Sequence, residues 1–303
     1  MKCVDLFAGS GGLSLGFEAA GYEVVAAYEC WDAAIECYRS NFDHPVLKRD
    51  LSDSRSAASE IAAFEPDVIM GGPPCQDFSH AGKRAEGDRA DLTEAFAKIV
   101  ATVMPRIFVM ENVDRAAKSK AYLRAREMLV EAGYGLTERV LDASRCGAPQ
   151  KRKRFICVGM LKEDDGFLNQ TIDRMLSPLP MTVRDYFGDD LAIEHYYRHP
   201  RNYSRRAIFS VDEPSPTVRG VNRPVPSGYP GHPGDSAPVD SRIRALSTAE
   251  RARLQPFPHD FVWVGSKTNV EQMIGNAVPV KLGEFVARAI ASYCGEESVC
   301  RAS

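Results

Sequence analysis

Short apolar runs alternate with helix-like segments through the first half of this 303-residue chain. Patterns typical of buried strands occupy KCVDLF (2–7), YEVVAAYE (22–29), DVIM (67–70) and RIFVMEN (106–112). Patterns typical of helices occupy 13–22, 31–42, 91–104 and 119–132. Because strands and helices alternate, we predict an α/β fold with a mostly parallel twisted sheet wrapped by helices.

The composition changes after about residue 165. Prolines and glycines recur from 177 to 238, which disfavours long helices. Aromatic and apolar residues such as Tyr196 and Phe209 are interleaved with them, so we expect a folded, loop-rich domain and not a linker. Helices are predicted again at 247–255, with a Ser247–Glu250 capping box, and at 279–293. Arg244 is predicted to tether the two domains.

The overall composition is that of a soluble globular protein, with 44% hydrophobic and 26% charged residues. No run is long and apolar enough to span a bilayer, and no secretory signal is recognised. The eight cysteines are scattered without CxxC or a zinc spacing, so we expect reduced thiols, no metal and a cytoplasmic location.

The net charge of −3 conceals an uneven distribution. Residues 1–70 hold 5 Lys/Arg and 12 Asp/Glu, a balance of −7, so the remainder carries +4. Six arginines fall within 198–224, and Lys151 to Arg154 form a second basic cluster. Either these are solvated faces, or they attract a polyanion; charge alone does not decide.

A glycine loop, DLFAGSGG (5–12), joins the first predicted strand to the first helix. Glu29 ends the second strand 20 residues after Gly9, where an acid commonly holds ribose hydroxyls. The loop has Ser14 where a dinucleotide fingerprint has its third glycine, which counts against a nicotinamide oxidoreductase without excluding it. A tight structural turn is the other explanation.

A second loop, GGPPCQDFS (71–79), follows the DVIM strand and presents a thiol after two prolines. Cys3, Cys37 and Cys157 sit within apolar periodic segments and are expected to be buried and inert. Cys75 lies in a proline-rich turn, which is not core.

These motifs resemble those of the cytosine-5 DNA methyltransferase family, of the bacterial restriction–modification type. The resemblance rests on DLFAGSGG, GGPPCQDFS, Glu111-Asn112-Val113, the Gln150–Arg154 stretch QKRKR and Gly275–Pro279, GNAVP, in that order. It covers nearly the whole chain except about 165–240. It implies a Rossmann-like S-adenosylmethionine-dependent methyltransferase fold. Residues 1–165 and 263–303 would form the catalytic, cofactor-binding domain and 166–262 a target-recognition domain.

The resemblance also implies the chemistry. The Cys75 thiolate would add to carbon 6 of a flipped-out cytosine so that carbon 5 can take a methyl group. Glu111 would act at N3 as an acid, and Arg154 with Arg152 would hold O2. The base that removes the carbon 5 proton is not assigned, and water is possible.

Further residues are implied to bind the ligands. S-adenosylmethionine, which leaves as S-adenosylhomocysteine, would contact Phe7, Gly9, Gly11, Gly12, Glu29, Asp50, Pro73, Leu92 and Asn276. DNA would contact Ser79, Lys83, Arg84, Arg89, Thr217, Arg219 and Arg223, with the last two as base readers. Residues 79–92 are expected to form a lid, although Asp88 and Arg89 are adjacent here whereas the family separates them.

Two alternatives remain besides the oxidoreductase. The same chemistry could serve transfer RNA, and a catalytically silent DNA-binding regulator would have lost Cys75 and Glu111, which are both present. We expect a monomer that acts on double-stranded DNA in a bacterial or phage setting, without a membrane, and with any cognate restriction endonuclease as a separate protein.

Overall fold

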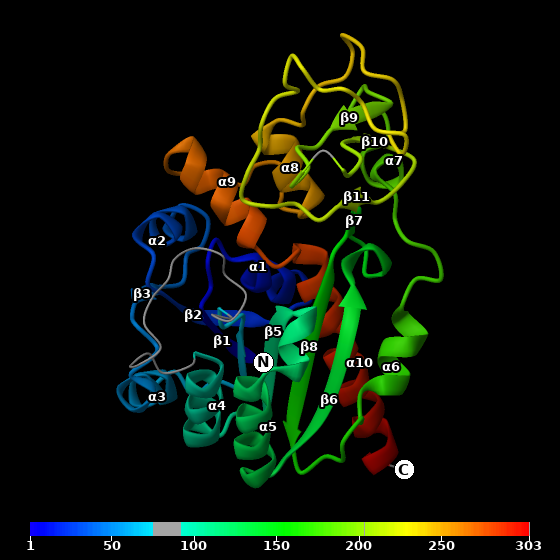
Figure 1. Cartoon of the computed structure of the whole chain (residues 1–303). Coiled ribbons are helices and arrows are strands. Elements are labelled where there is room, and N and C mark those ends of the chain that lie inside the picture. Colours follow the sequence, from blue (N-terminus) through cyan, green and yellow to red (C-terminus); the bar gives the residue numbers. More distant parts are fainter. Residues whose placement is uncertain (75–91, 203, 303) are drawn as a thin grey trace.

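A seven-stranded sheet forms the centre of the computed structural model, which describes residues 1–74, 92–202 and 204–302 (Figure 1). The strand order is β3-β2-β1-β4-β5-β8-β6. The strands are β1 (Lys2–Leu6), β2 (Glu23–Glu29), β3 (Val46–Lys48), β4 (Val68–Gly71), β5 (Ile107–Val113), β6 (Tyr134–Asp142) and β8 (Lys153–Leu161). The predicted α/β class and the mostly parallel sheet are confirmed: β3 to β5 are parallel, and β8 alone runs antiparallel to both of its neighbours.

Helices cover both faces of the sheet, as the alternating pattern requires. One face packs against α1 (Gly12–Ala19), α6 (Asn169–Met175) and α10 (Val280–Ala302), through residues such as Phe17 and Leu282. The other packs against α3 (Ser54–Ala62), α4 (Leu92–Val103) and α5 (Lys120–Glu131), through residues such as Phe96 and Leu129. Strands buried on both faces explain why the apolar runs are nearly continuous. The predicted burial of Cys3, Cys37 and Cys157 is confirmed.

The reversed direction of β8 determines where the site can form. β8 runs antiparallel to β5, so β8 begins at the edge of the sheet where β5 ends. Arg154 at the start of β8 therefore lies opposite Val113 at the end of β5. The short strand β7 (Gln150–Lys151) immediately precedes it and pairs with β11 (Ser215–Pro216). The QKRKR stretch therefore runs along the carboxyl edge of the sheet.

A smaller, loop-rich region stands above that carboxyl edge (Figure 1). It contains α7 (Val183–Phe187), β9 (His195–Tyr197), β10 (Ile208–Ser210), β11 and α8 (Thr248–Leu254). Its core also includes residues of α9 (Lys267–Asn276) and of α2 (Asp32–Arg39), such as Met273 and Cys37, so that one hydrophobic cluster joins the two regions. Elsewhere in the described residues, two short 3-10 helices occupy Asp114–Lys118 and Ala143–Arg145.

The predicted Ser247–Glu250 capping box is present at the start of α8. Helix α9 and the strands β6 and β8 were not expected, and α10 continues beyond the predicted end at 293. Within the described residues, the helices include none of the length and apolarity that a membrane span needs.

Candidate active site

The glycine loop turns sharply between β1 and α1. Phe7, Gly9 and Gly11 all have positive φ, at 59°, 56° and 87°. A Cβ on Gly12 would lie 2.2 Å from the Val278 carbonyl oxygen, so only glycine lets this loop meet the GNAVP stretch. A Cβ on Gly11 would instead collide with the Phe42 and Tyr38 rings. Gly11 thus serves the turn and its packing, on the side away from the cleft described below.

Glu29 is fixed at the end of β2 by three backbone amides. Its Oε2 accepts from Gly9 N at 2.8 Å, and its Oε1 accepts from Cys30 N and Trp31 N at 2.8 and 2.9 Å. The carboxylate therefore joins the glycine loop to the turn after β2. This is the position at which an acid was predicted to hold a ribose.

One cleft of about 520 Å³ opens along the carboxyl edge, within the usual range for small-molecule sites. Every predicted cofactor residue except Gly11 lines it: Phe7, Gly9, Gly12, Glu29, Asp50, Pro73, Leu92 and Asn276. Three of the four predicted catalytic residues, Glu111, Arg152 and Arg154, line it as well. The structure thus brings the two predicted sites together in one continuous space.

The loop that leads to the predicted nucleophile is anchored from β5. Asn112 Nδ2 donates to the Pro73 carbonyl at 2.9 Å, and a Cβ on Gly72 would lie 3.1 Å from Glu111 Oε2. The chain therefore leaves β4 directly beside the Glu111 carboxyl. Five predicted site residues lie outside the described residues: Cys75, Ser79, Lys83, Arg84 and Arg89.

Glu111 and Arg154 form a buried ion pair at this edge. Arg154 Nε lies 2.8 Å from Glu111 Oε1, and their side chains are 14% and 10% exposed. Burial raises the pKa of Glu111 above its ordinary value, although Arg154 and then Arg152 act to lower it. A carboxyl in this balance can hold a proton and donate it, which is what an acid at a ring nitrogen must do.

Arg152 has a different environment from the one predicted. Its side chain is among the most buried in the protein, and its guanidinium donates to the carbonyls of Val218, Gly275 and Ala277 at 2.9, 3.0 and 3.1 Å. These bonds commit both terminal nitrogens to the backbone. Arg152 therefore lines the cleft as a structural residue that links these backbone segments. Arg154 is the arginine whose side chain pairs with Glu111.

A buried polar network behind the glycine loop escaped the sequence analysis. Ser14 Oγ donates to Asp5 Oδ2 at 2.7 Å and lies 2.7 Å from the Tyr38 hydroxyl, which in turn lies 2.6 Å from His44 Nε2. Asp5 is one of the residues that line the cleft, and its buried Oδ1 has no hydrogen-bond partner among the described residues. Burial raises the pKa of Asp5 to about 7. The signal was Ser14 itself, whose departure from glycine supplies a hydroxyl.

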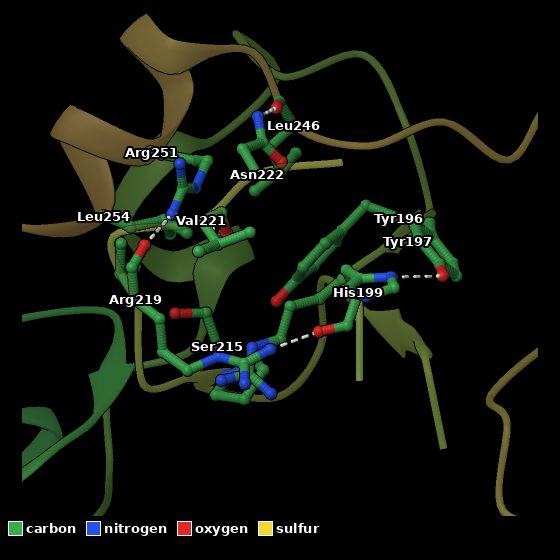
Figure 2. Close-up of a pocket in the computed structure, with 13 residues that line it drawn as sticks. Tyr196, Tyr197, His199, Ser215, Arg219, Val221, Asn222, Leu246, Arg251 and Leu254 are labelled. Carbon is green, nitrogen blue, oxygen red and sulfur yellow. Dashed lines mark hydrogen bonds between the residues drawn. The ribbon is translucent and has the colours of Figure 1, made fainter. Parts of the chain in front are cut away.

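Arginines hold residues 217–222, the segment that contains two of the predicted DNA contacts, Thr217 and Arg219. The carbonyls of Thr217, Val218 and Arg219 accept from Arg198, Arg152 and Arg251 respectively. Figure 2 shows the Arg251 bond, and it shows the Arg219 guanidinium donating to the His199 carbonyl. The cavity in this view is only about 30 Å³, which is the room of one water molecule.

The other predicted DNA contacts differ in their surroundings. Thr217 Oγ1 donates to the Lys151 carbonyl at 2.8 Å, whereas Arg223 is exposed. Arg201 and Arg205 are exposed too, and within the described part of the chain no side-chain hydrogen bond or ion pair is found for any of these three arginines. The tether predicted at Arg244 is wrong: its guanidinium pairs with Glu250 of α8, within the same region.

The fold is that of the Rossmann-like methyltransferases, and its cleft joins a glycine turn to a buried carboxyl–guanidinium pair. The model of one family, C-5 cytosine-specific DNA methylase, matches residues 1–292. The chain belongs to this family.

Similar proteins agree with that assignment. The chain is 55% identical to the Type II methyltransferase M.HindV of Haemophilus influenzae over 97% of each chain. It is 52% identical to the Type II methyltransferase M.HgiDI of Herpetosiphon aurantiacus, over 98% of this chain and 96% of that one. The chain is thus a DNA (cytosine-5-)-methyltransferase, a transferase that carries a methyl group to DNA. The transfer RNA alternative is not favoured.

Solved structures support the fold. Schizosaccharomyces pombe Dnmt2 methyltransferase superimposes with a TM-score of 0.70 at 19% identity, over 96% of this chain and 98% of that one. A putative DNA modification methyltransferase encoded within an Escherichia coli prophage gives 0.70 at 22% identity, over 97% and 99%.

Proposed function

We propose that this enzyme transfers a methyl group from S-adenosylmethionine to carbon 5 of a flipped-out cytosine in a specific duplex DNA sequence, through a covalent Cys75 adduct. The observation that carries the proposal is the single cleft that joins Glu29 and the glycine loop to Glu111 and Arg154. A methyl donor at one end and a pyrimidine at the other would share it.

The residues present suit the donor. Glu29 and Asp50 offer carboxylates for hydroxyl and amino groups, and the glycine loop exposes backbone at positive φ. Asp5 Oδ1 is a buried oxygen without a partner in the described chain, beside the same loop. Phe7 would lie beside the adenine and Asn276 near the methionine part. When bound, S-adenosylmethionine supplies an electrophilic methyl group.

The chain's own groups would make the cytosine reactive. The Cys75 thiolate forms a bond to carbon 6 as the carbon 5–carbon 6 double bond opens, and the electron pair moves through the ring while N3 takes a proton from Glu111. Carbon 5 of the resulting enamine would then bond to the methyl group as the bond from that methyl group to the donor's sulfur breaks, which releases S-adenosylhomocysteine. Loss of the carbon 5 proton to a base re-forms the double bond and expels the thiolate, and N3 returns its proton to Glu111.

Two neighbouring side chains would have roles in this reaction. Arg154 would hold the cytosine O2, because its guanidinium already stands beside Glu111 at the start of β8. Asn112 would keep the Cys75 loop in place through the Pro73 carbonyl. Water must be excluded while the enamine exists, and the predicted lid at 79–92 would do this.

The basic face of the smaller region would hold the duplex. Arg201, Arg205 and Arg223 are exposed and suited to phosphate or base contacts, whereas Arg198 is committed to a carbonyl. Arg219 donates to His199, so it would read a base only after giving up that bond. Residues 166–262 would then act as the target-recognition domain.

A trapping experiment tests the proposal. Bisulfite sequencing of DNA from cells that express the protein identifies the methylated word, and a duplex carrying 5-fluorocytosine at that position is incubated with enzyme and S-adenosylmethionine. Fluorine replaces the hydrogen that must leave carbon 5 as a proton, so the thiolate cannot be expelled and a stable adduct at Cys75 should form. Cys75→Ser should bind the duplex without forming an adduct or methylating it. Adduct formation at another residue, or turnover by Cys75→Ser, contradicts the assignment.

We propose further that the enzyme acts as a monomer in a restriction–modification system, in the bacterial or phage-infected cytoplasm. The Type II methyltransferase relatives support this setting, as do the free thiols at Cys3, Cys30, Cys37, Cys146 and Cys157. A separate endonuclease would cleave the same word when it is unmethylated. Challenge of the methylated DNA with endonucleases that cut this word checks the prediction of protection.

A further inference from the structure

The Arg152 guanidinium joins two segments that the proposed function assigns to different ligands. Its Nη1 donates to the Val218 carbonyl at 2.9 Å, within the 217–222 segment, here called the recognition loop. Its Nη2 donates to the carbonyls of Gly275 and Ala277, which stand on either side of Asn276 in the 275–278 segment, here called the donor loop. A single planar group therefore holds both loops at once.

A pair of buried glutamines makes a second connection between the same loops. Val218 N donates to Gln150 Oε1 at 2.8 Å, and Gln150 Nε2 donates to Gln255 Oε1 at 2.7 Å. Gln255 Nε2 in turn donates to the carbonyls of Ile274 and Ala277 at 2.6 and 3.1 Å. Both the amide and the carbonyl of Val218 are thus tied to the donor loop through side chains that are almost fully buried.

The backbones of the two loops also touch directly. A Cβ on Gly275 would lie 2.1 Å from Gly220 N and 2.4 Å from the Arg219 carbonyl carbon. There is no room between the loops for even one methyl group, so neither loop can shift without the other. Tightly packed contacts of this kind switch between discrete arrangements and do not deform continuously.

We propose that Arg152 is a positioning residue that couples occupancy of the recognition loop by DNA to occupancy of the donor loop by the methyl donor. The proposal rests on the proposed function, since it needs the donor near Asn276 and DNA on the recognition loop. DNA that orders the recognition loop also orders the donor loop. The methyl donor, when it binds second, therefore loses less conformational entropy. By linkage, each ligand raises the affinity for the other by the same factor.

The test measures that coupling factor. S-adenosylhomocysteine is titrated by calorimetry into the full chain, alone and saturated with a duplex carrying the methylated word found by bisulfite sequencing. The wild-type enzyme should bind it more tightly with DNA, by a factor in the usual range of about 5 to 150. Arg152→Lys keeps the positive charge near Glu111 but cannot span three carbonyls, so its factor should fall below about 2.

Arg198→Lys is the matched control. Arg198 is a half-buried arginine that also donates to a carbonyl of the recognition loop, that of Thr217, at 2.7 Å. Among the described residues its guanidinium has no hydrogen bond to the donor loop, so its substitution should weaken DNA binding and leave the coupling factor within about twofold of the wild-type value. Gly275→Ala leaves the Arg152 side chain itself unchanged but forces apart the loops whose carbonyls it binds, and it should lower the factor too. This variant serves if Arg152→Lys does not fold.

The outcomes distinguish a failure of the proposed function from a failure of the coupling through Arg152. A wild-type enzyme that binds no S-adenosylhomocysteine contradicts the proposed function. A wild-type enzyme that binds it without any help from DNA contradicts the coupling alone. An unchanged factor in folded Arg152→Lys, together with a lost kcat, shows that Arg152 acts on the cytosine directly. An equal loss of coupling in Arg198→Lys shows that any loosening of the recognition loop has this effect.

Discussion

Arg154 and Glu111 form an ion pair between the antiparallel strands β8 and β5, with Nε 2.8 Å from Oε1, close to Gly72, where the chain leaves β4. Two opposing effects act on the carboxyl there. Burial raises its pKa, and the adjacent guanidinium lowers it. Because burial is the larger effect, the proton is held more tightly than in water. The same partner that orients Glu111 thus limits how far its pKa rises.

Glu111→Gln should abolish most of the turnover while keeping the side-chain shape. An amide can accept and donate hydrogen bonds but cannot give up a proton to N3, so we expect kcat to fall by about 10² to 10⁴, the usual contribution of a general acid. The duplex should still bind. Single-turnover methylation of the identified word measures the change. Wild-type activity should also decline as the pH rises through the raised pKa of Glu111, because only the protonated carboxyl is active.

Glu138→Gln is the control for this substitution. Glu138 lies on β6, away from the cleft, and pairs with Arg126 through Oε2 at 3.1 Å. The same chemical change there should leave kcat within about twofold, since a partly exposed ion pair contributes at most about 1 kcal/mol to stability. A Glu111→Gln enzyme with near wild-type kcat would remove Glu111 from the chemistry.

The exposed arginines should differ from the half-buried Arg198 in how they affect DNA binding. Arg205→Ala and Arg223→Ala should each reduce the slope of log affinity against log salt by about 1, because each removes one positive charge from the proposed DNA-binding face. Neither should lower the melting temperature, since both side chains are exposed. Fluorescence anisotropy between about 50 and 200 mM salt measures the slope.

Arg198→Ala is the variant to compare with Arg205→Ala and Arg223→Ala. Its side chain is half-buried and donates to the Thr217 carbonyl, so its loss leaves a partly buried acceptor without this partner and should destabilise the fold by about 1–3 kcal/mol. Binding should weaken through the loop that it supports. Should Arg205→Ala and Arg223→Ala leave the salt slope unchanged, the duplex would have to lie on another face.

Asp5→Asn should remove a pH dependence of stability. The pKa of Asp5 is about 7 in the folded chain, against about 3.9 for an aspartate in a peptide. Between these values the folded state binds the proton and the unfolded state does not, so unfolding free energy falls as the pH rises from about 4 to 7. The loss approaches 4 kcal/mol at most, at about 1.36 kcal/mol per pKa unit.

Urea denaturation at pH 5, 6, 7 and 8 measures this dependence. The wild-type curve should descend more steeply than that of Asp5→Asn, and Asp43→Asn should follow the wild type, because Asp43 is exposed. Parallel curves for Asp5→Asn and the wild type would show that Asp5 is ionised throughout and that its network stabilises the charge.

The sequence predicted the sheet and most of the cleft for a physical reason. A strand, a turn and a helix follow one another within a few residues, so Gly9, Glu29 and Glu111 could each be assigned to the end of a strand from local pattern alone. The loop-rich region gave no such periodicity. Arg152 and Arg154 look equivalent in QKRKR, and only the pairing of β7 with β11 turns the first into the interior and leaves the second at the cleft.

Other differences have the same origin in long-range contacts. Arg198 and Arg219 counted as parts of a basic cluster, yet their guanidinium groups bind carbonyls of the chain itself. Charge in a sequence does not say whether the group is solvated. Strands β6 and β8 were missed because β8 reverses direction beside β5, which an alternating pattern of strands and helices does not signal.

The close packing of α1 on α10 leads to the last prediction. A Cβ on Gly16 would lie 2.6 Å from Glu284 N and 2.7 Å from the Val280 carbonyl oxygen, both backbone atoms that cannot rotate away. Gly16→Ala should therefore force the helices apart and lower the unfolding free energy by about 1–3 kcal/mol. The displaced α10 follows directly from the donor loop, so affinity for S-adenosylhomocysteine should fall as well.

Gly295→Ala is the matched control on α10 itself. Gly295 is exposed, and a Cβ there would meet nothing within 4 Å, so the only effect is the better helix propensity of alanine. This variant should gain about 0.5–1 kcal/mol and bind S-adenosylhomocysteine like the wild type. Urea melts of both variants with equal m-values give the comparison. If Gly16→Ala were as stable as Gly295→Ala, the tight contact between α1 and α10 would not exist in solution.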